Sequence, residues 1–127
     1  MEIKGIQKVT LLDYPGRVAC TVFTGGCNFR CPFCHNAPLV LPEELAHDTD
    51  EEQVLSFLKK RAGVLDGVAI TGGEPLLHSD IGAFLEKVRA LGFRFPDRLM
   101  DIVRAGLVDR VAMDIKNSPE LYAKTAG

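Results

Sequence analysis

Short apolar runs alternate with amphipathic helical patterns along this chain, and this alternation constrains its fold more than any other feature. The runs at residues 17–23, 67–71 and 110–114 predict strands. Residues 81–91 carry their apolar side chains at the spacing of one helix face. Because parallel strands need a crossover helix between them, the alternation predicts an α/β fold with a parallel sheet.

Local signals place the ends of the predicted helices. Thr49 and Glu52 have the spacing of a capping box, and Gly63 stands where the helix behind them would stop. Ser79 is the expected cap of the next helix, which Gly92 would end.

Composition bounds the class of protein. The chain has 127 residues, of which 46% are hydrophobic and 25% charged, and this describes one globular domain. A formal net charge of −2 without any run of basic residues argues against nucleic-acid binding. No leader or long apolar segment is visible, so we expect no membrane association and a cytoplasmic location. In that compartment, four cysteines favour metal or redox chemistry over disulfides.

Three of the cysteines, Cys27, Cys31 and Cys34, stand in one short loop and are separated by three and then two residues. Three thiolates at this spacing can bind a soft metal centre from one side. The missing fourth ligand leaves a coordination position at which a reactant could bind, and open coordination usually accompanies catalysis.

A structural zinc site is the alternative interpretation of the cysteine loop, with Cys20 or His35 as the fourth ligand. His35 is adjacent in the chain to Cys34, which would strain a tetrahedral site. Cys20 stands inside an apolar predicted strand, where a small buried thiol is common. The cluster-type site is therefore favoured, and the zinc site stays open.

Two further groups of residues follow the other predicted strands. After the second strand, Gly72 and Gly73 would let a ligand approach the backbone, and Glu74 offers a carboxylate to an ammonium group. After the third, Asp114 and Lys116 are two residues apart and point to one side if the strand persists. Alone, each group could be an ordinary turn. Together with the cysteine loop they share the sheet edge at which α/β proteins bind ligands.

With these residues in view, the chain resembles radical S-adenosylmethionine enzymes of the glycyl-radical activating group. It is most similar to the activating proteins of anaerobic ribonucleoside-triphosphate reductases. The segments that carry the resemblance are residues 11–16, 26–36, 71–75 and 112–116. The three-cysteine motif with an aromatic residue before its last cysteine is specific for the superfamily, whereas the flanking segments indicate the subgroup.

The resemblance implies a 4Fe-4S cluster held by Cys27, Cys31 and Cys34, with S-adenosylmethionine chelating the fourth iron. The reduced cluster would cleave S-adenosylmethionine to methionine and a 5′-deoxyadenosyl radical, which takes hydrogen from a glycine Cα of a partner enzyme. The implied partners are a glycyl radical enzyme and an electron donor of the flavodoxin or ferredoxin type. The residues that the resemblance assigns to the S-adenosylmethionine site are Gly72, Gly73 and Glu74 at the amino group, Asp114 and Lys116 at the polar end, and Phe33 near the adenine.

The resemblance also implies the fold, namely the N-terminal part of a partial (β/α) barrel of the radical SAM type. Residues 1–127 would form one truncated radical SAM core, because a complete eight-fold barrel takes about 250 residues. A predicted helix at residues 96–105 follows the last helical residue, Leu91, after only four residues, 92–95. We therefore expect one internal strand to be missing and the parallel sheet to be open, which puts the activity of this chain in doubt.

Two other functions fit the same residues. One is a radical SAM enzyme that acts on a small molecule, such as a deazapurine synthase. The other is a non-catalytic iron-sulfur or zinc module that keeps the cysteine loop after losing the rest of its barrel.

Overall fold

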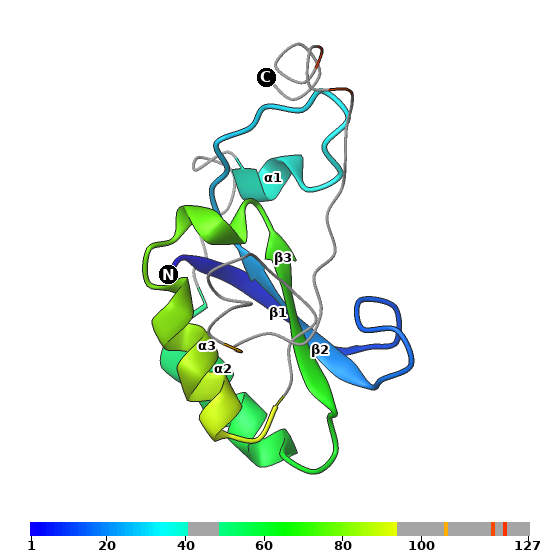
Figure 1. Cartoon of the computed structure of the whole chain (residues 1–127), viewed down its shortest axis with the longest axis vertical. Coiled ribbons are helices and arrows are strands. Elements are labelled where there is room, and N and C mark those ends of the chain that lie inside the picture. Colours follow the sequence, from blue (N-terminus) through cyan, green and yellow to red (C-terminus); the bar gives the residue numbers. More distant parts are fainter. Residues whose placement is uncertain (41–48, 94–105, 107–117, 119–120, 122–127) are drawn as a thin grey trace.

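The computed structural model of this chain describes residues 1–40, 49–93, 106, 118 and 121. Within them the elements are, in chain order, β1 (Ile3–Thr10), β2 (Ala19–Thr24), α1 (Ala37–Val40), α2 (Glu51–Arg61), β3 (Gly67–Gly72), the short 3-10 helix η1 (Pro75–Leu77) and α3 (Ile81–Ala90). Figure 1 shows the three strands side by side, with α2 and α3 together beside them.

The described strands form one sheet in the order β1-β2-β3. β2 and β3 are parallel and stay in register from the pair Ala19 and Gly67 to the pair Thr24 and Gly72, which confirms the predicted parallel pairing. β1 is antiparallel to β2, so the expectation that the sheet begins near residue 17 and is wholly parallel was wrong. The sequence of β1, IKGIQKVT, has no continuous apolar run, because much of this strand is only partly buried.

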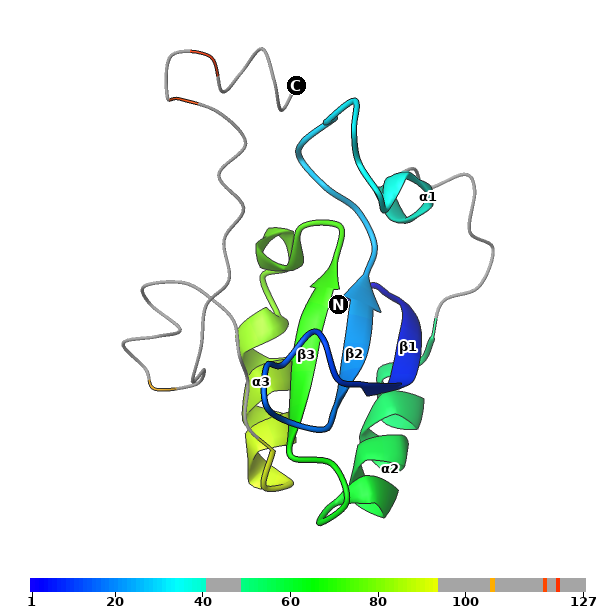
Figure 2. The ribbon, with the colours of Figure 1, turned by 90° about the vertical axis from the view of Figure 1, so that its right-hand side faces the viewer.

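The hydrophobic core lies between one face of the sheet and the two long helices (Figure 2). Val22 of β2 and Val68 of β3 meet Leu58 of α2 and Phe84 and Val88 of α3, and each of these side chains is almost fully buried. Each such side chain contributes about 1.5–3 kcal/mol through removal of apolar surface from water. This core fixes the position of β2 relative to β3, and thereby the position of the loops that follow them.

The helix caps differ in detail from those predicted. Asp50, rather than Thr49, caps α2, and its carboxylate Oδ1 accepts a hydrogen bond of 3.2 Å from the amide of Glu52. Asp80, rather than Ser79, precedes α3 and makes no capping bond through its side chain. Both predicted helices exist, and their ends differ from the predicted ones by one or two residues.

The last continuous stretch of described residues ends at Phe93, just after α3. Gly92 turns the backbone with φ +89°, and Phe93 is buried in the core. The described residues do not include the predicted helix at 96–105, the predicted strand at 110–114 or residues 94–95 of the junction between the two predicted helices. The partial barrel and its missing strand therefore stay predictions. No helix in the described part of the chain combines the length and the apolar character needed to cross a membrane.

Candidate functional site

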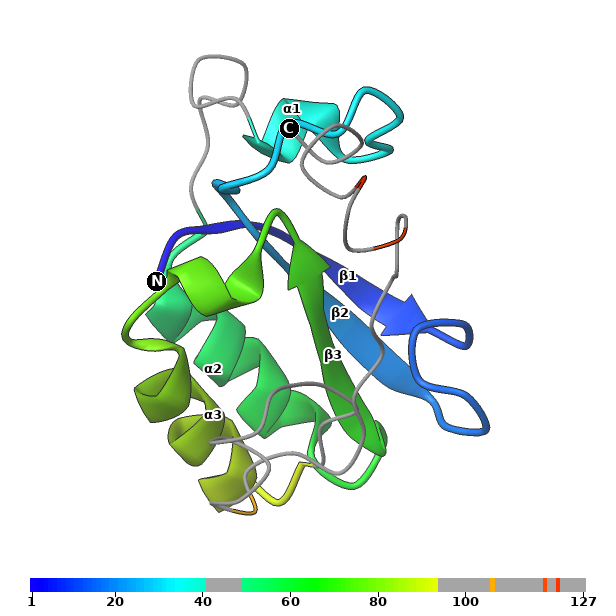
Figure 3. The same ribbon diagram turned by 45° about the horizontal axis from the view of Figure 1, so that its top comes forward.

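The cysteine loop and the glycine turn leave the sheet at the same level (Figure 3). Here the cysteine loop means residues 25–36, which follow β2, and the glycine turn means residues 72–74, at the end of β3 and just after it. Their alignment follows from the register, in which Thr24 is the partner of Gly72. Two of the three predicted groups therefore meet at one edge of the sheet, as the sequence predicted.

The glycine turn packs directly against the backbone of the cysteine loop. The amide of Gly73 donates to the carbonyl of Thr24 over 2.8 Å, and the amide of Glu74 donates to the carbonyl of Gly26 over 2.9 Å. A Cβ atom on Gly73 would lie 1.8 Å from the Gly26 oxygen. Gly72 has φ +114°, and a Cβ atom there would lie 2.4 Å from the Thr24 oxygen. The two glycines thus allow the chain's own backbone to approach closely, a role the sequence interpretation did not assign to them.

Further hydrogen bonds tie the cysteine loop to residues 72–78 and to α1. The amide nitrogen Nδ2 of Asn36 donates to the Gly72 carbonyl over 3.3 Å, and the His78 ring nitrogen Nε2 lies 3.0 Å from the Gly25 carbonyl. The amide of Gly26 donates to the carbonyl of Leu39 in α1 over 2.9 Å. Sequence reasoning missed these contacts, although Asn36 ends the recognised segment 26–36 and His78 stands three residues beyond the segment 71–75.

Local hydrogen bonds shape the cysteine loop. Its three thiols are half-buried, and the Cys34 amide donates to the Cys31 carbonyl over 3.1 Å in a tight turn. The Cys27 sulfur accepts the amide of Phe29 over 3.3 Å, and the Arg30 guanidinium donates to the Cys27 carbonyl over 2.7 Å.

The three sulfurs do not form a ready-made ligand set. In the part of the chain that the structure describes, no three His, Cys, Asp or Glu side chains converge closely enough to hold a metal ion. The assignment of Cys27, Cys31 and Cys34 as the cluster ligands therefore stays a prediction. Their chemistry nevertheless fits a thiophilic cluster: all three are partly accessible thiols on one short loop, and none is in a disulfide.

The fourth cysteine, Cys20, is separate from the loop. It stands in β2, is fully buried among core side chains, and burial raises the pKa of its thiol to about 12. This confirms the prediction that Cys20 lies in a strand, and it leaves the zinc alternative without that ligand. His35, the other candidate, is exposed beside Cys34.

The remaining predicted site residues have different outcomes. Glu74 is half-buried and stands before η1 rather than in a regular helix, and its Oε1 atom accepts the amide of Leu76 over 3.0 Å. Phe33 lies in the cysteine loop with 47% of its surface exposed. Asp114 and Lys116 fall outside the described residues, so their place at this edge stays a prediction.

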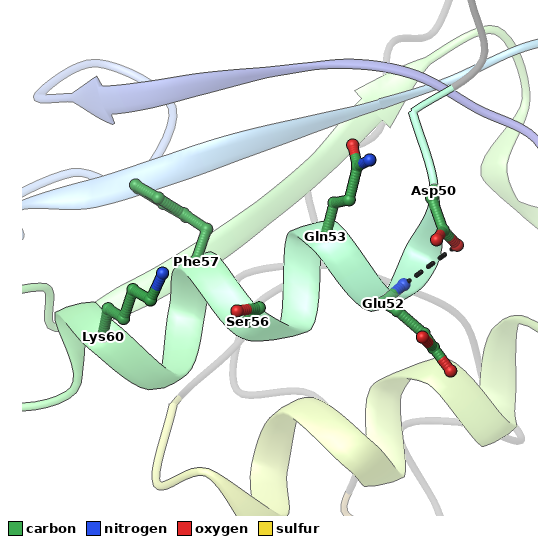
Figure 4. Close-up of a pocket in the computed structure, with 6 residues that line it drawn as sticks. All are labelled: Asp50, Glu52, Gln53, Ser56, Phe57 and Lys60. Atoms are coloured by element: carbon green, nitrogen blue, oxygen red, sulfur yellow. Dashed lines mark hydrogen bonds between the residues drawn. The ribbon is translucent and has the colours of Figure 1, made fainter.

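A shallow hollow runs along α2, apart from the cysteine loop and the glycine turn (Figure 4). Its lining consists of α2 residues and the α2 cap, namely Asp50, Glu52, Gln53, Ser56, Phe57 and Lys60. Most of these side chains are polar, and none belongs to the cysteine loop or the glycine turn, so the hollow is not part of the candidate site.

Comparison with known proteins identifies the family of this chain. The profile of the Radical SAM superfamily matches residues 21–127. A Methanocaldococcus jannaschii protein described as a glycyl-radical enzyme activating enzyme is 31% identical, over 90% of this chain and 50% of its own length. The pyruvate formate-lyase-activating enzyme of Listeria monocytogenes is 30% identical, over 96% of this chain and 56% of its own.

Relatives of another kind match a shorter part of the chain. A Halobacterium salinarum protein described as a GTP 3′,8-cyclase is 36% identical, over 72% of this chain and 30% of its own length. The chain thus spans about half the length of the activating-enzyme relatives. Because the superfamily profile covers most of the sequence, including the cysteine loop and the glycine turn, this chain belongs to the radical SAM superfamily.

Proposed function

We propose that this chain is the core of a radical SAM activating enzyme that generates a glycyl radical on an anaerobic ribonucleoside-triphosphate reductase. The observation that carries the proposal is the bonding of the cysteine loop to the glycine turn at one edge of the sheet, through the Glu74 amide and the Gly26 carbonyl. The activating-enzyme relatives, which match nine-tenths or more of the chain, support the class of reaction. Residues 11–16 and 112–116 support the reductase as partner through the resemblance.

The cofactor requirement follows from the superfamily, whose members use a 4Fe-4S cluster and S-adenosylmethionine. When bound, this pair supplies one-electron cleavage of the sulfonium to methionine and a carbon radical that can take a hydrogen atom from a glycine Cα. Cys27, Cys31 and Cys34 would hold the cluster, since they are accessible thiols on one loop.

The glycine turn would hold the amino acid part of S-adenosylmethionine. Gly73 and Glu74 already fix the cysteine loop beside this turn. The Glu74 carboxylate is the acidic group of this turn and would accept from the ammonium group. In this proposal Gly72 contributes its backbone, Phe33 packs near the adenine, and Asp114 and Lys116 orient the polar end. The electron would come from a flavodoxin or ferredoxin-type donor.

The first experiment tests the cofactor site with matched cysteine variants. The chain and its Cys31→Ala and Cys20→Ala variants are reconstituted anaerobically with iron and sulfide, and bound iron is measured beside the paramagnetic resonance spectrum of the reduced protein. We expect Cys20→Ala to bind iron as the parent does, and Cys31→Ala to lose the cluster. A change in the spectrum on adding S-adenosylmethionine would support binding at the open coordination position. Equal iron in both variants would refute the assignment.

The second experiment separates a protein substrate from a small one. A radical SAM enzyme acting on a small molecule is the second candidate, favoured by the GTP 3′,8-cyclase and 7-carboxy-7-deazaguanine synthase relatives. The reconstituted protein is reduced with S-adenosylmethionine and either an anaerobic ribonucleotide reductase or GTP. A glycyl radical signal on the reductase supports the proposal, whereas 5′-deoxyadenosine formed only with GTP supports the second candidate. A cluster that forms without binding S-adenosylmethionine would indicate the non-catalytic module.

A further inference from the structure

We infer that His78 is a positioning residue that fixes the base of the cysteine loop, meaning Gly25 and Gly26, against the segment after β3. Its ring nitrogen Nε2 lies 3.0 Å from the carbonyl oxygen of Gly25, 53 residues earlier in the chain. Because a carbonyl only accepts, Nε2 must carry the proton in this contact. The contact therefore requires a hydrogen on the ring nitrogen that faces the cysteine loop.

The backbone that carries the His78 ring is itself fixed. The His78 amide donates to the Pro75 carbonyl over 3.3 Å and closes η1, and its carbonyl accepts the amide of Ile81 over 3.2 Å at the start of α3. Ile81 and Phe84 anchor that end of α3 in the core. The ring thus projects from a rigid junction toward the loop.

The Gly25 side of the contact has little freedom either. The amide of Gly25 donates to the Glu2 carbonyl over 3.0 Å, which ties it to the start of the chain. A Cβ atom on Gly25 would lie 2.7 Å from Lys4 Cε and 2.9 Å from Glu2 Cδ. Gly25 is therefore held between these side chains and the His78 ring, and its carbonyl has a fixed direction.

Two bonds then join the loop base to the segment after β3, one from the Glu74 amide to Gly26 and one from His78 to Gly25. The bond from His78 adds to those that Glu74 and Asn36 make across the same edge of the sheet, so it further restricts the rotation of the loop. Cys27 follows directly, so His78 limits how far this cysteine can move from Glu74. This inference rests on the proposed function: a cofactor that spans the cysteine loop and Glu74 binds best when their separation is set in advance.

The affinity test uses three variants in the reconstituted protein. His78→Gln keeps an N–H donor at a similar reach, His78→Leu removes the donor, and Ser79→Leu places the same apolar side chain at the exposed neighbouring position. We expect all three to bind iron as the parent does. S-adenosylmethionine should bind about five- to tenfold more weakly to His78→Leu, the effect of losing one hydrogen bond, and near parent strength to the other two.

Several results would overturn the inference. Equal affinities in His78→Leu and the parent would do so, as would equal losses in His78→Gln and His78→Leu. Loss of iron from His78→Leu would place the role in cluster assembly instead. If His78→Leu does not fold, His78→Asn replaces it, since its amide is too short to reach Gly25 and should give the same loss.

A second measurement does not depend on the cofactors. Long-range proton–nitrogen correlation spectra of the protein without a cluster report which ring nitrogen of each histidine is protonated, and the His78 signals are identified by their absence in His78→Gln. We expect Nε2 of His78 to carry a hydrogen, and an Nε2 atom without one would refute the contact. If the parent protein binds no S-adenosylmethionine, the proposed function fails while this spectrum still decides the role of the ring.

Discussion

Replacing Gly73 by alanine is expected to force the glycine turn and the cysteine loop apart. The new Cβ atom would lie 1.8 Å from the Gly26 oxygen and 2.7 Å from its carbonyl carbon, and both atoms belong to the backbone. Real Cβ contacts are essentially never closer than 3.0 Å, so the two segments must separate by at least the difference, 1.2 Å. That movement breaks the 2.9 Å bond between the Glu74 amide and the Gly26 carbonyl.

The cost can be estimated from its two parts. Overpacking a close contact costs about 1–3 kcal/mol, and loss of the hydrogen bond adds about 0.5–1.5 kcal/mol. We therefore expect Gly73→Ala to lower the free energy of unfolding by about 2–4 kcal/mol, a large share of the stability of a small domain.

Gly82→Ala is the matched control. Gly82 lies within α3, and a Cβ atom there would meet nothing within 4 Å. The same chemical change should raise stability at Gly82 by about 0.5–1 kcal/mol, because alanine is the better helix former. Urea unfolding followed by circular dichroism measures both variants. A Gly73→Ala protein as stable as the parent would show that the turn and the loop do not approach as described.

Three further predictions concern the scaffold. In the native protein without a cluster, iodoacetamide at pH 8 should label the three loop cysteines but not Cys20, and mass spectrometry after denaturation should reveal the fourth thiol. Because burial raises the pKa of Cys20 from 9.0 to about 12, the contribution of Cys20 to stability should fall as the pH increases above 9. Asp50→Ala should lower the free energy of unfolding by about 1 kcal/mol through loss of the α2 cap, and an unchanged urea midpoint would contradict this. Phe84→Ala should cost about 3–5 kcal/mol by leaving a cavity between α3 and the sheet, and a loss below 1 kcal/mol would show that the site is not tightly packed.

The sequence predicted the parts of the fold that have strong periodicity. The strands at β2 and β3, their parallel pairing and the helices α2 and α3 follow from apolar runs and from one-sided helix faces. β1 could not be predicted in this way, because Lys4, Gly5, Gln7 and Lys8 interrupt its apolar residues. Its pairing with β2 depends on contacts across the sheet, which a local pattern does not contain.

The candidate site was predictable at the level of residue types and not of contacts. Spacing identified the cysteines and Glu74, because a motif lies within a few consecutive residues. It could not show that Gly73 packs against Gly26, or that His78 reaches Gly25, since these pairs are about 50 residues apart and meet only through the register of β2 and β3.

The parallel register of β2 and β3 sets the position of the cysteine loop relative to the glycine turn. Thr24 and Gly72 are partners at the ends of their strands, so β2 and β3 must have the same number of residues between the first pair in the register and this one. One residue inserted within either strand would move its loop by about 3.3 Å and turn its side chains to the opposite face. An insertion at residues 62–66, before β3 begins, would leave both exits aligned. Variation in length should therefore be tolerated at the end of the sheet far from the cysteines and excluded from the strands themselves.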